Sequence, residues 1–242
     1  MSDVVLAPYH GGLGDHLQFS TLPEEFYKQQ NRKTYIWANA PYRNSEIYDF
    51  VWGTNPFVLG KSSNEWNAGD PSGIVYQNIG KTSIMNQEAS NGLIPKNYYP
   101  KIYYKPLKNI KFNDVYLVDF SSITSEYDYP KLLSHYNMLK SMFTNITFLN
   151  VVFKNKLSDN NWKQYKTDDE SILVNNIFEY YDMMYSSKGF IGLQSGASCL
   201  SCAVKEHNSN LQSICFITKQ LYAELTEKNN FIFDNIEYFI YE

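Results

Sequence analysis

Cysteine is scarce in this 242-residue sequence, which contains three, Cys199, Cys202 and Cys215. An odd number of thiols argues against a small domain held together by several disulfides. Cys199 and Cys202 form a C-x-x-C pair, but no second pair and no nearby histidine arrangement accompanies it, which disfavours a zinc site. Two small buried side chains one helical turn apart are the expected interpretation.

Long apolar runs and an excess of positive charge are also missing. No stretch of about 18 apolar residues is present, and the N-terminus lacks the basic region and apolar run of a signal peptide, so we expect a cytoplasmic protein. The formal net charge of -4 argues against a nucleic-acid partner. With 43% hydrophobic and 19% charged residues, the composition is that of a folded globular protein.

Strand and helix patterns alternate at both ends of the chain. In the first half we expect a strand at 4–7, a helix interrupted near Pro23, a strand at 34–38 and a helix at 46–51 that is capped by Ser45 and ended by Gly53. Residues 54–108 show weak periodicity and predict short strands and long loops.

The alternation resumes after residue 114. We expect strands at 115–120, 145–153, 189–192 and 213–217, and helices at 131–143, 177–185 and 198–204. Such alternation is typical of α/β domains with parallel sheets. The pattern predicts two domains, residues 1–110 and 111–242, with Pro106 near the linker.

A glycine-rich turn between the first strand and the first helix has the sequence Gly11-Gly12-Leu13-Gly14-Asp15. In an open parallel sheet, ligands bind beyond the carboxyl ends of the strands, where a tight turn leads into a helix. The glycines let the backbone approach a ligand, and the first amides of the helix favour an anion. His10, Asp15 and His16 add titratable groups. Taken alone, the pattern is as consistent with a plain tight turn in which Asp15 caps the helix.

A second turn of small residues follows a strand in the other half, with the sequence Gly192-Leu193-Gln194-Ser195-Gly196-Ala197-Ser198. Its hydroxyls and backbone amides can bind a diphosphate without a metal ion. The alternative is a serine cap followed by a helix that packs closely through small residues. One such turn in each half predicts two Rossmann-like domains that face each other across a cleft.

Both turns resemble motifs of the family 9 glycosyltransferases, the ADP-heptose-using heptosyltransferase group, which have the GT-B fold. The residues from Gly11 to Leu17, with Thr21 and Pro23, resemble the family's G-x-G-D turn and the T-P sequence after it. The residues from Phe190 to Leu200, with Ala203, resemble its I-G-x-D-[ST]-G-x-x-H-L-A-A stretch. Residues 44–56 resemble the region after the family's second strand.

The resemblance implies inverting, metal-independent transfer of a sugar, such as a heptose, from a nucleotide-diphosphate sugar to a hydroxyl acceptor such as a glycan, as in lipopolysaccharide synthesis. It makes Asp15 the base. His10 and His16 are the alternative catalytic residues, because the pKa of histidine suits proton transfer near neutral pH. The first domain would hold the acceptor and the second the donor, and the acceptor would account for any association with a membrane surface. No cofactor or metal is expected, and the oligomeric state is left open. The implied substrate-binding residues are Gly11, Gly12, Gly14, Gln194, Ser195, Gly196, Ala197 and Ser198.

The sequence also departs from the family pattern, because Gln194 replaces its acid and Cys199 its histidine. No residue clearly matches the basic residue that stabilises the leaving diphosphate in this family. Lys154, Lys156 and Lys205 are candidates for that role. Two rival functions stay open. One is a nucleotide-sugar epimerase, another enzyme class on the same fold, and the other, which these departures keep open, is a non-catalytic domain that binds a nucleotide sugar or a partner protein. A P-loop NTPase is rejected, because the glycine required before Gly80-Lys81-Thr82-Ser83 would fall at Val75.

Overall fold

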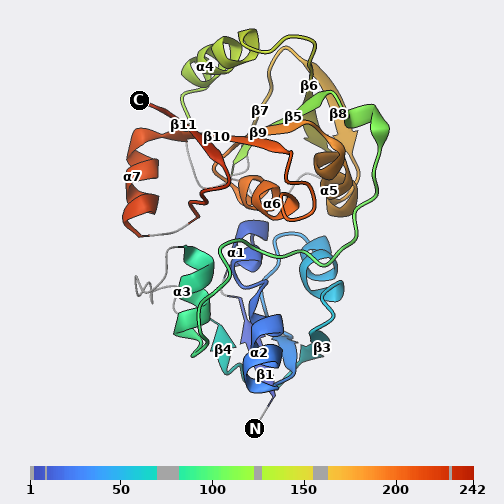
Figure 1. The fold of residues 1–242 in the computed structure, drawn as a ribbon, viewed down its shortest axis with the longest axis vertical. Coiled ribbons are helices and arrows are strands. Elements are labelled where there is room, and N and C mark those ends of the chain that lie inside the picture. The colour runs from blue at the N-terminus through green and yellow to red at the C-terminus, as the bar shows by residue number, and fades with distance from the viewer. Residues whose placement is uncertain (1–2, 9, 70–81, 123–126, 155–162, 229–230) are drawn as a thin grey trace. The chain divides into compact units, whose positions relative to one another are not determined.

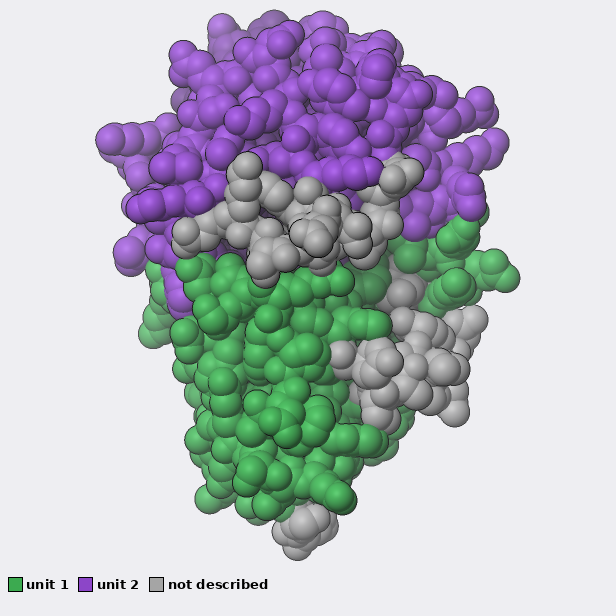
Figure 2. Space-filling view, turned by 180° about the vertical axis from the view of Figure 1, so that it is seen from behind, with its two compact units in different colours: residues 1–105, 223–233 green, residues 106–222, 234–242 purple. Residues whose placement is uncertain are grey.

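A computed structural model describes residues 3–8, 10–69, 82–122, 127–154, 163–228 and 231–242 (Figure 1). Helices alternate with strands, and the strands form two sheets that are parallel apart from one added strand. The predicted α/β class with parallel sheets is confirmed. The chain divides into two compact units, coloured separately in Figure 2. Unit 1 comprises Met1–Lys105 and Ala223–Phe233, and unit 2 comprises Pro106–Tyr222 and Asp234–Glu242.

The sheet of unit 1 has the strand order β3-β2-β1-β4, and every pair of neighbours is parallel. Its strands are β1 (Val4–Ala7), β2 (Thr34–Trp37), β3 (Val58–Ser62) and β4 (Ala68–Gly69). The chain runs from β1 outward to β3 and then returns to place β4 on the other side of β1. The switch point of this sheet therefore lies between β1 and β4, and loops at the carboxyl end of β1 border it.

Two helices connect β1 to β2, namely α1 (Leu13–Gln18) and α2 (Leu22–Gln30). The predicted interruption near Pro23 is confirmed, since Pro23 occupies the first turn of α2, where a missing N–H removes no intrahelical bond. Glu24 and Glu25 follow it in that first turn, where acidic side chains interact favourably with the helix dipole. The buried strand β1 also matches its predicted bounds.

The middle of unit 1 differs from the prediction in two ways. The expected helix at 46–51 continues as a π-helix, η1 (Tyr48–Gly53), and the side chain of Asn44 rather than Ser45 accepts the Glu46 amide, at 2.9 Å. The helix α3 (Ser83–Ser90) was not predicted. Its buried positions include Asn86, Gln87 and Glu88, so its inward face carries no apolar pattern to reveal it.

Three buried carboxylates on α2 and α3 bind residues 96–103, near the end of the stretch Met1–Lys105. Glu88 on α3 accepts hydrogen bonds from the Lys96 amide, at 2.7 Å, and from the Thr21 hydroxyl, at 2.9 Å. Glu25 pairs with the Lys96 ammonium group at 2.7 Å. Glu24 accepts from Lys101 and from the Tyr103 hydroxyl, both at 2.8 Å. Residues 96–103 are thereby fastened to α2 and α3.

The main sheet of unit 2 is parallel and has the order β11-β10-β9-β5-β6-β8. A further strand, β7 (Lys163–Tyr165), pairs antiparallel with the end of β5. The switch point lies between β5 and β9, because the chain runs outward from β5 in one direction and later from β9 in the other. The strands are β5 (Val115–Ser122), β6 (Thr147–Phe153), β8 (Glu170–Val174), β9 (Gly189–Leu193), β10 (Gln212–Thr218) and β11 (Glu237–Tyr241).

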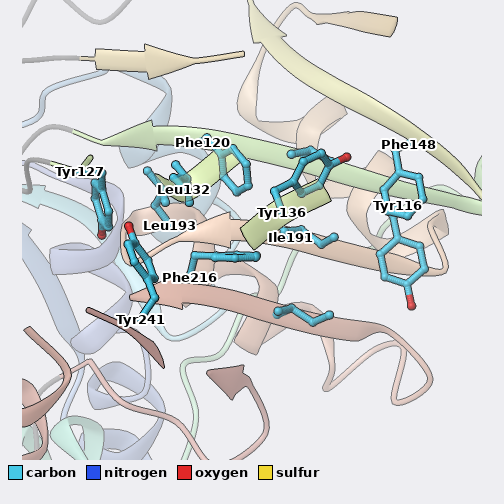
Figure 3. Packing of buried hydrophobic residues seen from close by; sticks show 12 residues of the cluster. Tyr116, Phe120, Tyr127, Leu132, Tyr136, Phe148, Ile191, Leu193, Phe216 and Tyr241 are labelled. Atoms are coloured by element: carbon cyan, nitrogen blue, oxygen red, sulfur yellow. The ribbon is translucent and has the colours of Figure 1, made fainter. Parts of the chain in front are cut away.

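Helices cover both faces of this sheet, with α4 (Tyr129–Ser141) on one side and α5 (Ile177–Ser186) and α6 (Gly196–Val204) on the other (Figure 1). On the α4 side, Phe120, Ile191 and Phe216 of the three central strands pack with Leu132 and Tyr136 of α4 (Figure 3). Alternate residues of the strands therefore face α5 and α6, which is how Asp119 on β5 meets Tyr180 on α5, at 2.8 Å.

The predicted strands and helices of the second half are present, with ends shifted by a few residues. Four elements were not predicted, the strands β7, β8 and β11 and the helix α7 (Lys219–Glu227). The strand β8 is an exposed sheet edge with one buried residue, and α7 has no buried residue, so neither carries a strong burial pattern. A short 3-10 turn, η2 (Ile110–Phe112), precedes β5. No helix in the described part of the chain is long and apolar enough to span a membrane.

Candidate functional site

The glycine-rich turn of unit 1 joins the end of β1 to α1 at the switch point. Gly11 packs against the segment 41–43, which follows β2, and its carbonyl accepts a hydrogen bond from the Arg43 amide at 2.8 Å. A Cβ atom on Gly11 would lie 3.0 Å from the Arg43 amide nitrogen and 3.2 Å from that of Tyr42. The glycine thus allows two backbone segments to approach closely at the edge of the sheet.

Asp15 lies in the first turn of α1 and folds back onto the glycine turn. Its Oδ2 accepts a hydrogen bond from the Gly12 amide at 3.0 Å, so it does cap the helix. A Cβ atom on Gly12 would lie only 2.7 Å from this oxygen. Burial raises the pKa of the Asp15 carboxyl, and His10, the Gly12 amide and Arg43 act against that rise. Asp15 is therefore a carboxylate with increased affinity for a proton.

His16 is fully buried, and both of its ring nitrogens are engaged. The Trp52 indole donates to Nδ1 at 2.9 Å, so Nδ1 is the acceptor and Nε2 carries the proton that it donates to the Pro41 carbonyl at 3.0 Å. The ring also stacks on Tyr42, with centroids 4.7 Å apart. Burial lowers the pKa of His16 to about 4, and it is neutral at pH 7. His16 thus ties α1 to the segment 41–43, while His10 is exposed.

The second candidate turn follows β9 and begins α6. Ser195 accepts a hydrogen bond from the Ala197 amide through its hydroxyl, at 3.2 Å. The Ser198 hydroxyl accepts from the Ser195 amide at 3.2 Å and donates to the Ser195 carbonyl at 2.7 Å. The two serines therefore form a reciprocal cap at the start of the helix. Ser195, Gly196 and Ala197 are half-buried, whereas Ser198 is buried.

Gln194 and Cys199 are both buried in unit 2. The side-chain oxygen Oε1 of Gln194 accepts from the Cys215 thiol at 3.3 Å and from the Ser198 hydroxyl at 3.5 Å. All three cysteines are buried and none forms a disulfide, consistent with the expected structural role of the C-x-x-C pair. Within the described ranges, no group of three or more histidine, cysteine or acidic side chains is arranged to hold a metal ion.

Sequence reasoning missed a buried carboxylate at the switch point of unit 2. Asp119 on β5 lies opposite Gly192 on β9. It accepts hydrogen bonds from the Ser121 amide at 3.0 Å, the Ser121 hydroxyl at 2.5 Å and the Tyr180 hydroxyl at 2.8 Å. Burial raises its pKa, and the Ser121 and Tyr180 hydroxyls act against the rise. The sequence signal that could have revealed Asp119 is an acidic residue within an apolar strand, because a buried acid requires a polar partner.

The basic candidates for diphosphate binding lie in different surroundings. The Lys205 ammonium group donates to the Asn235 carbonyl at 2.5 Å, and Lys154 is exposed. Lys156 and the rejected motif's Gly80 and Lys81 lie outside the described residues. Arg43, which was not predicted as a site residue, lies beside the first turn, where it acts on the Asp15 carboxyl together with His10.

Comparison with known proteins places this fold among glycosyltransferase structures. No family model matches the sequence, and no curated protein matches it. Among solved structures, the iron-containing dodecameric glycosyltransferase TibC from enterotoxigenic E. coli H10407 matches with a TM-score of 0.62 and 14% identity, over 89% of this chain and 58% of TibC. TibC in complex with ADP-D-beta-D-heptose matches with a TM-score of 0.59 and 12% identity, over the same shares.

The E. coli heptosyltransferase WaaC with ADP matches with a TM-score of 0.55 and 7% identity, over 99% of this chain and 93% of WaaC. The chain thus spans little more than half the length of TibC but nearly all of WaaC. At these identities the likeness establishes the fold alone. The chain has the mixed α/β architecture with parallel sheets that these glycosyltransferases have.

Proposed function

We propose that the protein is a glycosyltransferase that moves a sugar from a nucleoside-diphosphate donor to a hydroxyl acceptor, with inversion and without a metal ion. One observation carries the proposal: each candidate turn follows a strand beside the switch point of its own parallel sheet, β1 in unit 1 and β9 in unit 2. Ligand sites of open α/β sheets lie at such points. The likeness to TibC and WaaC supports a nucleotide sugar as donor, and a heptose is the first sugar to test.

In the proposed reaction, the acceptor oxygen attacks the anomeric carbon while the bond from that carbon to the diphosphate oxygen breaks. The acceptor's proton passes to Asp15, and the nucleoside diphosphate leaves with the bonding electron pair. The half-buried position of Asp15 favours this step, because desolvation raises the pKa of the carboxyl and makes the carboxylate a better proton acceptor. We assign His16 a positioning role, since both its nitrogens are already bonded. His10 is the alternative base.

On the donor side, we propose that the turn at 195–198 binds the diphosphate through backbone amides at the start of α6. Ser195, Gly196 and Ala197 are half-exposed and would face the donor, together with the neighbouring Gln194 and Ser198 as supporting residues. Unit 1 would then serve the acceptor and unit 2 the donor, in a GT-B arrangement. No cofactor is required by this scheme.

The decisive test of the base is Asp15→Asn, which keeps an oxygen to accept the Gly12 amide but removes the base. We expect release of nucleoside diphosphate from a panel of ADP-, UDP- and GDP-sugars to fall by about 100-fold or more, with an unchanged melting temperature. Asp49→Asn, at an exposed acid of η1, is the matched control and should keep full activity. Undiminished turnover by Asp15→Asn would remove Asp15 from the mechanism.

The donor site is tested separately by calorimetry with ADP, UDP and GDP. Gly196→Val adds a branched side chain at the half-exposed start of α6, and Ser195→Ala removes the cap. We expect both variants to bind the preferred nucleotide at least about 10-fold more weakly, equivalent to about 1.4 kcal/mol. Equal affinities in variant and native protein would place the donor elsewhere.

A non-catalytic nucleotide-sugar-binding domain is the second candidate, and the replacement of the family acid and histidine by Gln194 and Cys199 favours it. Both of these side chains are buried and pack within unit 2. The two candidates differ in one measurement: a binding domain raises its melting temperature with a nucleotide sugar but releases no nucleoside diphosphate. Product analysis also separates an epimerase, which would yield an altered sugar without an acceptor.

A further inference from the structure

Arg43 occupies a distinctive place in the chain. The sequence contains only two arginines, Arg32 and Arg43, against nineteen lysines. Arg32 follows the end of α2, where its guanidinium lies over the Phe26 ring, 5.4 Å from its centroid, and donates to the Gln30 side chain at 3.3 Å. Arg43 lies instead in the segment that closes on the glycine turn of the candidate site.

Both the backbone and the side chain of Arg43 lie close to this turn. Its amide donates to the Gly11 carbonyl at 2.8 Å. Its guanidinium nitrogen Nη1 lies 3.6 Å from the position that a Cβ atom on Gly12 would occupy, and the Asp15 Oδ2 lies 2.7 Å from that same position. The space left by the missing side chain of Gly12 is thus bordered by a guanidinium group and a carboxylate, which attract each other.

The groups near Asp15 that oppose the effect of burial include two basic side chains, Arg43 and His10. Burial raises the pKa of the Asp15 carboxyl, while His10, the Gly12 amide and Arg43 lower it. On α1 itself, His16 is neutral and bonded to Trp52 and Pro41. On α3, which packs on α1, Glu88 is engaged by Thr21 and Lys96, and on η1, Asp49 is exposed.

We propose that Arg43 is a positioning residue for Asp15, holding the glycine turn through its backbone amide and holding the carboxylate in its ionised, base-competent form through its guanidinium. The proposal rests on the proposed role of Asp15 as the base. It also assigns a function to the segment 41–43, which reaches the site from the end of β2. A planar guanidinium can engage a carboxylate from several directions and cannot lose its proton, whereas an ammonium group is a single hydrated point charge.

The test compares Arg43→Gln, Arg43→Lys and the control Arg32→Gln in the full chain. Titration of Asp15 is followed by carboxyl-carbon NMR in the free protein, with Asp15→Asn used to assign the resonance. We expect Arg43→Gln to raise the Asp15 midpoint by about 0.5 to 1 pH unit and Arg43→Lys by less, while Arg32→Gln leaves it unchanged. Because Arg43 is exposed, the shift should shrink between about 20 mM and about 500 mM salt.

The same variants are then assayed for pH dependence of kcat/KM. On the acid side of the pH profile, the kcat/KM of Arg43→Gln should be about 3- to 10-fold below that of the native protein. At high pH its kcat/KM should return to the native value, which a purely structural defect would not allow. Because Arg43→Gln and Arg43→Lys both keep the amide that bonds to Gly11, the turn is expected to remain intact. An Asp15 titration that is identical in Arg43→Gln and native protein overturns the proposal, even if the enzyme is active. A shifted titration without any sugar transfer supports the proposed electrostatics and counts against the proposed function instead.

Discussion

The buried His16 should make unit 1 lose stability as the pH falls below 7. In the folded chain its pKa is lowered from 6.5 to about 4, because burial disfavours the charged ring. The unfolded chain therefore binds more protons than the folded chain between these two values. Stability is fully present above pH 6.5 and is lost progressively as the pH falls towards 4. From these two values the loss is about 2 kcal/mol between pH 7 and pH 5, and about 3 kcal/mol at pH 4.

The assay is urea unfolding at pH 7 and pH 5, followed by tryptophan fluorescence. Three of the four tryptophans, Trp37, Trp52 and Trp66, belong to unit 1, and Trp52 donates directly to the His16 ring. The variant His16→Gln offers an amide that can replace both hydrogen bonds but does not titrate. Its own destabilisation does not matter, because the measured quantity is the change in unfolding free energy between the two pH values.

We expect the native protein to lose about 2 kcal/mol more than His16→Gln on going from pH 7 to pH 5. Comparing the two proteins cancels the contribution of the carboxyl groups of unit 1 to the pH dependence of stability. These include Asp15, whose raised pKa adds stability as the pH falls, and Glu24, whose pKa is lowered to about 2. The control His207→Gln removes an exposed histidine and should behave like the native protein. Equal pH dependence in His16→Gln and native protein would refute the assignment of a buried, neutral ring.

Two further substitutions test the glycine turn and the carboxylates of unit 1. Gly12→Ala places a Cβ atom 2.7 Å from the Asp15 Oδ2, so we expect it to displace the carboxylate and lower transfer by about 10-fold or more with little change in melting temperature; full activity would contradict the described packing. Glu24→Gln removes the partner of Lys101 and Lys28 and should cost about 1 to 3 kcal/mol in urea unfolding at pH 7. That cost should vanish as the pH falls from 4.5 to about 2, because the pKa of Glu24 is lowered to about 2 and its stabilisation is lost as the carboxylate is protonated; a cost that persists there would contradict the ion-pair role.

The sequence predicted those parts of the fold whose signals are local. The break at Pro23 and the turn between β1 and α1 depend on residues adjacent in the chain, and both are present. The turn before α6 was found in the same way. In contrast, α3 has a polar buried face held by contacts such as the one between Glu88 and Thr21, which are far apart in sequence, so it carried no periodic signal.

Only part of the candidate site could be predicted from the sequence, for the same reason. Asp15 could be named from its motif, but the approach of Arg43 depends on a loop from the next strand. Trp52, which fixes the tautomer of His16, lies 36 residues further along the chain. Asp119 and its partner Tyr180 are 61 residues apart. Such pairings follow from the strand order and helix packing, which no local pattern encodes.

The three carboxylates that fasten residues 96–103 bear on how the chain passes from unit 1 to unit 2. Glu24 holds the Tyr103 hydroxyl, and on the far side the Leu107 amide donates to Asp182 at 2.8 Å. The Asn109 amide is likewise bound by the Ser186 hydroxyl at 2.8 Å. Between these two anchored stretches lies Pro106, which has a fixed φ and restricts the residue before it. The hydrogen bonds to unit 1 and those to unit 2 thus come within four residues of each other along the chain, at Tyr103 and Leu107.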